Sequence, residues 1–196
     1  MAESEAGASF PEEPMRDLSL HILDIAENSI EARARRIDIR IEENRLRDRL
    51  TLEIADDGQG MDKELLDRAL DPFVTTKKTR RIGLGLPMLA QAAKAAGGKL
   101  SLTSRPGRQT RVRATFRLGH IDLKPFGDIA QTLAVLIAGH PEIDIRYAHK
   151  TDGRIFRFDT RDLRAQLGGL SLATPHAIAL IRKDINDGLT RIRRLS

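Results

Sequence analysis

Residues 37–60 read IDIRIEENRLRDRLTLEIADDGQG, and this stretch decides the fold. Apolar and polar residues alternate over 37–42 and again over 50–54, and a polar segment at 44–48 separates the two runs. Alternation with a period of two is typical of half-buried strands, so the stretch predicts an antiparallel hairpin with one face in a core. The second strand runs directly into a glycine-rich turn, which begins at Asp56.

The flanking sequence predicts helices and two further strands. The spacing of apolar residues predicts helices over 17–34, 62–70 and 84–96, strands around 100–102 and 112–118, and a polar loop over 71–82. Pro87 is tolerated only in a first helical turn, so the third helix is expected to begin near Gly85. Four amphipathic strands with helices to cover them predict an α/β (α+β) fold, a two-layer sandwich with a mixed, largely antiparallel sheet.

The pattern of the sequence changes after Gly119. Residues 120–196 predict a small C-terminal accessory α/β unit, with helices over 126–138, 160–167 and 175–194 and a hairpin over 143–147 and 154–158. Residues 1–14 are polar and predict a flexible tail. The expected organisation is therefore a tail at 1–14, a main domain at 15–119 and the accessory unit at 120–196.

Composition excludes several classes of protein. The chain has 196 residues, a net charge of +5 and no cysteine, so it can form neither a disulfide framework nor a thiolate metal site. No apolar run approaches the ~20 residues that span a bilayer, and the acidic N-terminus does not resemble a signal peptide, so a cytoplasmic location is expected. The arginines are scattered, and one Tyr without any Trp argues against a nucleic-acid binder.

Two groups of polar residues are candidates for binding chemistry. Asp24 and Asn28 are four residues apart on a predicted helix, and their oxygens suit Mg²⁺ and its water shell, although an ordinary wet helix face has the same spacing. The Asp56 carboxylate would accept a hydrogen bond from an exocyclic amine, while Gly58 and Gly60 would allow close approach to a ligand. A plain glycine-rich turn is the alternative at this position.

Two further segments suit phosphate groups. Residues 83–86, Gly-Leu-Gly-Leu, open a predicted helix whose free N–H groups and dipole favour an anion. They are neither a P-loop nor a dinucleotide fingerprint. The basic segment at 75–81 could fold over phosphates as a lid, or could be a solvated run of charge.

The order of these motifs resembles the GHKL superfamily of gyrase, heat-shock chaperone, histidine kinase and MutL ATPases. The resemblance covers roughly residues 15–118 and is closest to the histidine-kinase-like ATP-binding domain. The matching segments are ILDIAENSIEA at 22–32, DDGQGM at 56–61, DPFVTTK at 71–77 and IGLGLPMLAQAAKAAGGKLSL at 82–102.

The resemblance implies a role for each matching residue. Asn28 would coordinate Mg²⁺, and Asp56 would bind the adenine amino group with Thr110 sharing a water. The remaining implied contacts to ATP come from Gly58, Gly60, Met61, Gly83, Leu84, Gly85 and Leu86, with Lys77 reaching the terminal phosphate.

The chain departs from the family pattern at three points. Hydrolytic members have a Glu four residues before the Mg²⁺-binding Asn, whereas this chain has Asp24, one methylene shorter, as a possible weak general base. Gln109-Thr110 replaces the usual Gly-Thr. Too few residues precede Asn28 for a phosphoacceptor segment, so a stand-alone domain is expected, and His21 is expected at the pocket edge.

The sequence therefore predicts a Mg-ATP-binding protein of the histidine-kinase-like type, an ATPase or a protein kinase acting in trans. The alternative is a nucleotide-gated interaction module with little or no hydrolysis. Residues 120–196 are the expected contact for a protein partner, with no membrane involved.

Overall fold

The computed structural model describes residues 17–70 and 85–193. The predicted tail, the predicted loop over 71–82, and Lys77, Gly83 and Leu84 lie outside the described residues. The helices are α1 Leu18–Glu31, α2 Lys63–Arg68, α3 Gly85–Ala95, α4 Ile129–Gly139, α5 Thr160–Gln166 and α6 Pro175–Arg193, with a 3-10 turn at Arg45–Arg47. The strands are β1 Arg36–Asn44, β2 Arg49–Asp56, β3 Lys99–Ser104, β4 Thr110–Arg117, β5 Asp144–Thr151 and β6 Arg154–Asp159.

The six strands form one mixed sheet in the order β3-β4-β2-β1-β5-β6. The predicted hairpin of β1 and β2 lies at its centre, and Ile39 pairs with Ile54 in an antiparallel register. The β1–β5 pair is parallel, while each of the other neighbouring pairs is antiparallel. The predicted two-layer α/β fold with a mixed, largely antiparallel sheet is confirmed.

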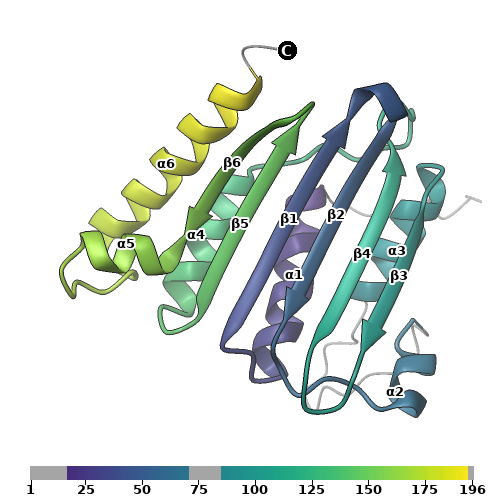
Figure 1. Ribbon diagram of the computed structural model, residues 1–196, viewed down its shortest axis with the longest axis horizontal. Helices are drawn as coiled ribbons and strands as arrows, with labels where there is room; N and C mark the ends of the chain where they lie inside the picture. Colours follow the sequence, from purple (N-terminus) through teal and green to yellow (C-terminus); the bar gives the residue numbers. More distant parts are fainter. Residues whose placement is uncertain (1–16, 71–84, 194–196) are drawn as a thin grey trace, which may run out of the picture.

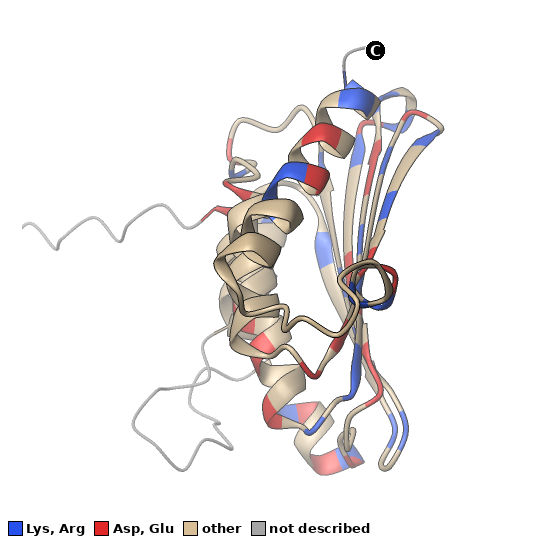
Figure 2. Cartoon of the chain, turned by 90° about the vertical axis from the view of Figure 1, so that its left-hand side faces the viewer, with Lys and Arg blue, Asp and Glu red and all other residues tan. Residues whose placement is uncertain are grey.

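The helices α1, α3, α4 and α6 form a layer on one face of this sheet (Figures 1 and 2). Alternate strand residues point into that layer, so the inward residues of β1 are buried while their neighbours on the other face are half-buried or exposed. The core includes Ile22, Ile37, Leu133, Ile145 and Ile181, each 0 % exposed. One hydrophobic cluster therefore joins residues from both predicted parts of the chain.

The predicted accessory unit contributes directly to the same sheet. Its hairpin, β5 and β6, is present as expected, and β5 pairs with β1 along its length, from Arg36 with Asp144 to Glu43 with Thr151. The amphipathic pattern predicted each strand, but alternation does not specify which edge a hairpin joins. The boundary at 119/120 stays a prediction, whereas the continuity of the sheet across it is observed.

Within the described part of the chain, no helix layer covers the second face of the sheet (Figure 2). Strand register assigns to it the basic residues Arg36, Arg40, Arg49, Lys99, Arg111, Arg113, Arg117, Arg146, Lys150 and Arg157. The acidic residues on it are Asp38, Glu42, Glu53, Asp144 and Asp159. We call this surface the open face, and on it basic residues outnumber acidic ones.

Within 17–70 and 85–193, no helix is both long and apolar enough to cross a membrane.

Candidate functional site

Helix α1 carries the first group of predicted site residues. The helix begins after Asp17, whose side chain accepts a hydrogen bond from the Leu20 N–H at 3.0 Å and caps the N-terminus. Its apolar side packs into the core, and Ser29 is buried on that side. Asp24 and Asn28 are half-buried on a neighbouring side of the helix, one turn apart. The predicted pair therefore lies at the margin of the helix layer, accessible to a ligand.

Asp56 is the last residue of β2, and its side chain points toward the same helix. It is only 6 % exposed. One carboxylate oxygen contacts the Ser29 Oγ at 2.9 Å, and the other accepts a hydrogen bond from the Gly58 N–H at 2.9 Å. The carboxylate predicted to recognise a base is thus held against the residue that follows Asn28.

Among the described residues, the Asp56 carboxylate has fewer hydrogen-bond donors around it than it can accept. Burial raises its pKa above the ordinary value, and the hydrogen bonds from Gly58 and Ser29 only partly oppose this effect. An ionised carboxylate has about four lone-pair positions, so two further donors could be accepted. A buried carboxylate with spare acceptor positions is suited to binding a ligand's N–H groups.

The glycines of the turn after Asp56 allow it to lie very close to neighbouring protein atoms. A Cβ on Gly58 would lie 2.8 Å from the Ala32 carbonyl oxygen and 2.9 Å from an Asp56 carboxylate oxygen. Gly60 has a φ of +68°, and a Cβ there would lie 2.1 Å from the Arg105 carbonyl oxygen. Within the described residues, the close approaches that require these glycines are made to backbone carbonyl oxygens and to the Asp56 side chain.

Thr110 lies directly beside Asp56, since the two are register partners between β4 and β2. The Thr110 Oγ1 is 2.9 Å from the Ser104 Oγ, which in turn accepts a hydrogen bond from the Met61 N–H at 2.8 Å. These hydroxyls and the Asp56 carboxylate form one polar row at this end of the sheet. The structure therefore brings together the predicted residues Asp56, Met61 and Thr110.

Helix α3 meets α1 at its first described residue, Gly85. A Cβ on Gly85 would lie 3.1 Å from the Asp24 Cβ and 3.7 Å from the Asn28 Nδ2. The N-terminal turn of a helix has N–H groups without partners inside the helix, and here that turn faces the two polar residues of α1. The side chain of Leu86, the next predicted residue, packs against the hydrophobic core.

The three predicted motifs therefore converge on residues 28–29 of α1. Ser29 contacts Asp56, and Asn28 is adjacent to Gly85. Glu27 points away from this junction, and its carboxylate lies 3.5 Å from the His140 Nε2. His21, expected at the pocket edge, is 2 % exposed.

Sequence reasoning missed two hydroxyl residues, Ser29 and Ser104. Ser29 carried a signal, because a polar residue that shares the buried side of a helix requires a hydrogen-bond partner. Ser104 carried none, since a Ser near a strand end is common. Its role depends on pairing between β3 and β4, where it is the register partner of Thr110.

The donor atoms at the junction fit a magnesium ion that is shared with a phosphate ligand. Asn28 and Asp24 offer hard oxygens, the type that Mg²⁺ prefers. Across the described ranges, no group of three or more His, Cys, Asp or Glu could enclose a metal without a ligand. Mg²⁺ is commonly held through one or two side chains plus phosphates and water, and this donor set suits that mode.

A search of family models gives the class of the protein. Residues 15–120 match the family described as "Histidine kinase-, DNA gyrase B-, and HSP90-like ATPase". This segment is more than half of the chain and contains α1, β2 and α3. The chain belongs to this family of ATPases.

The curated relatives include two bacterial proteins that are named as kinases. Nitrogen regulation protein NtrY of Azorhizobium caulinodans is 35% identical over 80 residues, which are 40% of this chain and 10% of that protein. Sensor protein kinase FleS of Pseudomonas aeruginosa is 40% identical over 89 residues (45% and 22%), and sporulation kinase D of Bacillus subtilis is 31% identical over 94 residues (48% and 18%). The chain spans less than a quarter of the length of these relatives.

A solved structure shares the fold. It is titled "Crystal Structure of N terminal domain of a DNA repair protein", with a TM-score of 0.52 and 18% identity. The match covers 72% of this chain and 51% of that one. Because 72% of the chain is longer than the segment 15–120 that matches the family, the structural likeness extends beyond residues 15–120.

Proposed function

We propose that this protein binds Mg·ATP at the junction of α1, the end of β2 and the start of α3. The observation that carries the proposal is the convergence on residues 28–29, where Ser29 contacts Asp56 and Asn28 lies beside Gly85. Three motifs separated in the sequence meet at one turn of one helix. The family to which the chain belongs supports the same assignment.

Each residue has a task that follows from its chemistry. The Asp56 carboxylate accepts hydrogen bonds from the adenine amino group and from a bridging water, which Thr110 helps to hold beside it. Asn28 supplies an amide oxygen to Mg²⁺, which neutralises phosphate charge. Backbone N–H groups at the start of α3 bind the phosphates, and Gly85 allows α3 to lie against α1 at that point.

We infer that the bound nucleotide is hydrolysed or donates its terminal phosphoryl group to another protein. Asp24 lies one helical turn before Asn28 on this side of α1, and it would orient or deprotonate the attacking group. Positioning and the stabilisation of phosphate charge would supply most of the rate acceleration. The similarity to a sensor protein kinase and to a sporulation kinase supports phosphoryl transfer.

A nucleotide-gated interaction module is the second candidate. Asp24 reaches less far than the Glu of hydrolytic family members, which favours binding with little turnover. Residues 120–193 would then contact a protein partner, and their strands share a sheet with the nucleotide-binding part. Binding at one part could change the other through β1 and β5, which are paired along their length.

Calorimetry with ATP, ADP and GTP in the presence of Mg²⁺ tests nucleotide binding. Asp56→Asn should weaken ATP binding about tenfold to a hundredfold, because a charged acceptor is lost from a buried site. Asp57→Asn is the matched control, since that exposed carboxylate caps the Arg35 and Arg36 N–H groups at 2.8 Å. Wild-type protein that does not bind ATP would refute the proposal.

Turnover distinguishes the two candidates. Phosphate release above that of an Asn28→Ala variant, or transfer of labelled γ-phosphate to a protein substrate, supports the enzyme. Binding by calorimetry with neither signal supports the gated module.

A further inference from the structure

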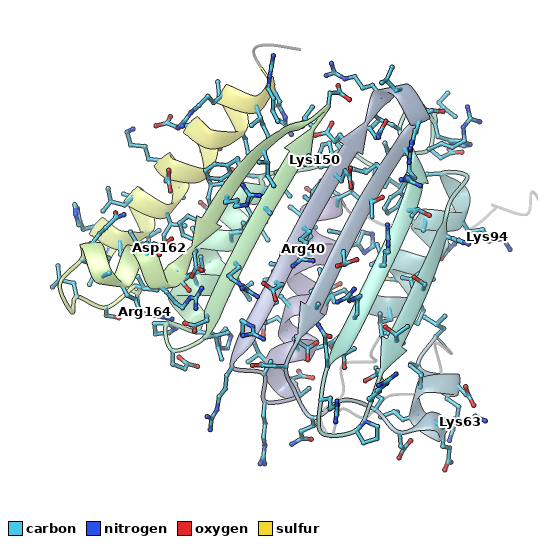
Figure 3. All side chains as sticks on the ribbon, viewed as in Figure 1. Arg40, Lys63, Lys94, Lys150, Asp162 and Arg164 are labelled. Carbon is cyan, nitrogen blue, oxygen red and sulfur yellow. The ribbon has the colours of Figure 1, made fainter. Side chains whose placement is uncertain are left out.

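The open face has a separate feature that the nucleotide site does not use. Figure 3 looks onto this face, with Arg40 of β1 near its middle and Asp162 of α5 toward one edge. The side chains of Asp56 and Thr110 point to the opposite side of the sheet, toward the helices. Any ligand of the open face would therefore bind at a site separate from the nucleotide site.

Strand register aligns charged residues in one row across the open face. Arg113, Glu53, Arg40, Ala148 and Arg157 are successive register partners on β4, β2, β1, β5 and β6. Arg40 and Arg157 thus flank Ala148, with Cα atoms about 10 Å apart, since neighbouring strands are separated by about 4.8 Å. The small Ala148 side chain leaves space between two guanidinium groups.

A hollow occupies this position. It has a volume of about 290 Å³, and its lining includes Arg40, Ala148 and Arg157. Asp162 lies at its rim on α5. The hollow is large enough for an acidic side chain together with part of a peptide backbone.

Two of the three acidic residues that line the hollow, Asp38 and Asp159, already have partners. Asp38 accepts a hydrogen bond from Arg146 at 2.6 Å, and Asp159 accepts one from Arg161 at 2.7 Å. In the described part of the chain, Arg157 forms no ion pair. Arg40 has one long contact of 3.4 Å, to Glu53.

We propose that the open face docks an acidic segment of a partner protein, with a Glu or Asp carboxylate bound between Arg40 and Arg157. Charge complementarity carries this choice, because two guanidinium groups with spare donors face one hollow. The inference extends the proposed protein partner to a defined surface, and it does not depend on ATP binding.

The same residues favour a protein over a nucleic acid. Among the described strand residues of the open face there is no aromatic side chain, so bases would find no stacking platform. Carboxylates of Asp159 and Asp162 also line the hollow, and a DNA phosphate backbone has no N–H donor to offer them. A peptide can meet these carboxylates with its own N–H groups or a Lys.

The probe is a short synthetic peptide of alternating Glu and Ser, with the Gln version of the same peptide as its control. Binding is measured by fluorescence anisotropy and mapped by NMR at low salt. We expect the Glu peptide to bind and to shift the signals of Ala148, Arg40 and Arg157. An Arg40→Gln/Arg157→Gln variant should lose about tenfold in affinity, as expected for two exposed charge contacts.

Two control variants distinguish binding in the hollow from a general effect of the protein's net charge. Arg182→Gln/Arg191→Gln removes the same charge from exposed positions of α6 and should change affinity less than about twofold. Ala148→Leu fills the hollow without a change in charge and should also weaken binding. This variant gives the result if the double arginine variant does not fold, which thermal melting would detect.

Three outcomes would overturn the proposal. They are the absence of Glu-peptide binding by wild type, an equal loss in the α6 control, and NMR shifts confined to another surface. Tighter binding of duplex or single-stranded DNA, lost in the Arg40→Gln/Arg157→Gln variant, would assign the face to nucleic acid instead. None of these results depends on whether calorimetry detects ATP.

Discussion

Two buried carboxylates lie at opposite ends of the central hairpin, and their surroundings differ. Asp56 ends β2, and its hydrogen-bond partners among the described residues are two neutral groups, the Ser29 hydroxyl and the Gly58 N–H. Glu43 lies near the end of β1 and is 9 % exposed. One of its oxygens is 2.6 Å from the His149 Nε2, and the same oxygen accepts a hydrogen bond from Thr151 at 3.3 Å.

The pKa values of the two groups shift in opposite directions. Burial raises the pKa of Asp56, and neutral donors do not compensate. Burial would also raise the pKa of Glu43, but the hydrogen bond and charge of His149, together with Arg193 and Thr151, hold it below its ordinary value. The comparison teaches that burial alone does not separate Asp56, the proposed nucleotide-binding carboxylate, from Glu43, whereas the number and charge of their partners do.

The largest expected effect on stability is at Glu43. Glu43→Ala removes the acceptor from a His149 side chain that is 0 % exposed and should lower the free energy of unfolding by about 2 to 3 kcal/mol. Urea denaturation at neutral pH measures it. ATP affinity should not change, because Glu43 is at the far end of the strands.

Glu42→Ala is the matched control for Glu43→Ala. Glu42 is half-exposed on the open face and pairs with Lys150 at 3.0 Å, so its loss should cost less than about 1 kcal/mol. Equal losses from the two substitutions would mean that the buried network does not distinguish Glu43 from a surface acid.

Asp56→Asn should have the opposite consequence for stability. The amide can accept from Gly58 and donate to the Ser29 Oγ, while Ser29 donates to the Ile25 carbonyl oxygen, now 3.2 Å away. Removal of a poorly compensated buried charge should keep or raise stability, by about 1 kcal/mol, while ATP binding falls. A variant that is both unfolded and inactive in binding would show that Asp56 is structural, like Glu43.

The pH dependence of unfolding should separate the two acids further. The lowered pKa of Glu43 means that its contribution is fully present above its unfolded value of 4.5 and is lost as pH falls through its folded pKa. The raised pKa of Asp56 means that its destabilising contribution grows as pH rises above its unfolded value of 3.8 and through its folded pKa.

Urea denaturation between about pH 3 and pH 7 measures these slopes. Glu43→Gln should reduce the acid-induced loss of stability seen in wild type, whereas Asp56→Asn should steepen the net rise in stability with pH. Identical pH profiles for wild type and both variants would contradict the assigned directions.

Much of the fold and several site residues were predictable from the sequence because their signals are local. Alternation at 37–42 and 50–54 determines which side chains are buried, and this fixed the inward face of the central hairpin. Asp56 and Gly58 form a turn motif within three residues, and Asn28 occupies a position on a recognisable helix. Such patterns require no knowledge of distant contacts.

The features that could not be predicted from the sequence depend on pairing between segments distant in the chain. The parallel contact of β1 with β5 joins residues more than a hundred positions apart, and no local pattern specifies it. The same pairing creates the Glu43–His149 contact and the row through Arg40 and Arg157. Charge that is scattered in the sequence is therefore clustered on the open face.

The smallest expected effect is at Gly85, where α3 meets α1 near the Asp56 end of the sheet. In Gly85→Ala the new methyl would lie 3.1 Å from the Asp24 Cβ, closer than ordinary contact, so α3 must move by a few tenths of an ångström. We expect ATP affinity to fall about threefold to tenfold by calorimetry, because the helix N–H groups would no longer align with the phosphates.

Stability should hardly change in this variant, because alanine favours a helix more than glycine does and offsets the contact. Gly139→Ala, at the end of α4, is the matched control, since a Cβ there would meet nothing within 4 Å. If both substitutions leave ATP affinity unchanged, the fit between α1 and α3 does not position the phosphates. The difference between the Asp56 end and the Glu43 end of the sheet would then lie only in how the charge of each buried carboxylate is compensated by its partners.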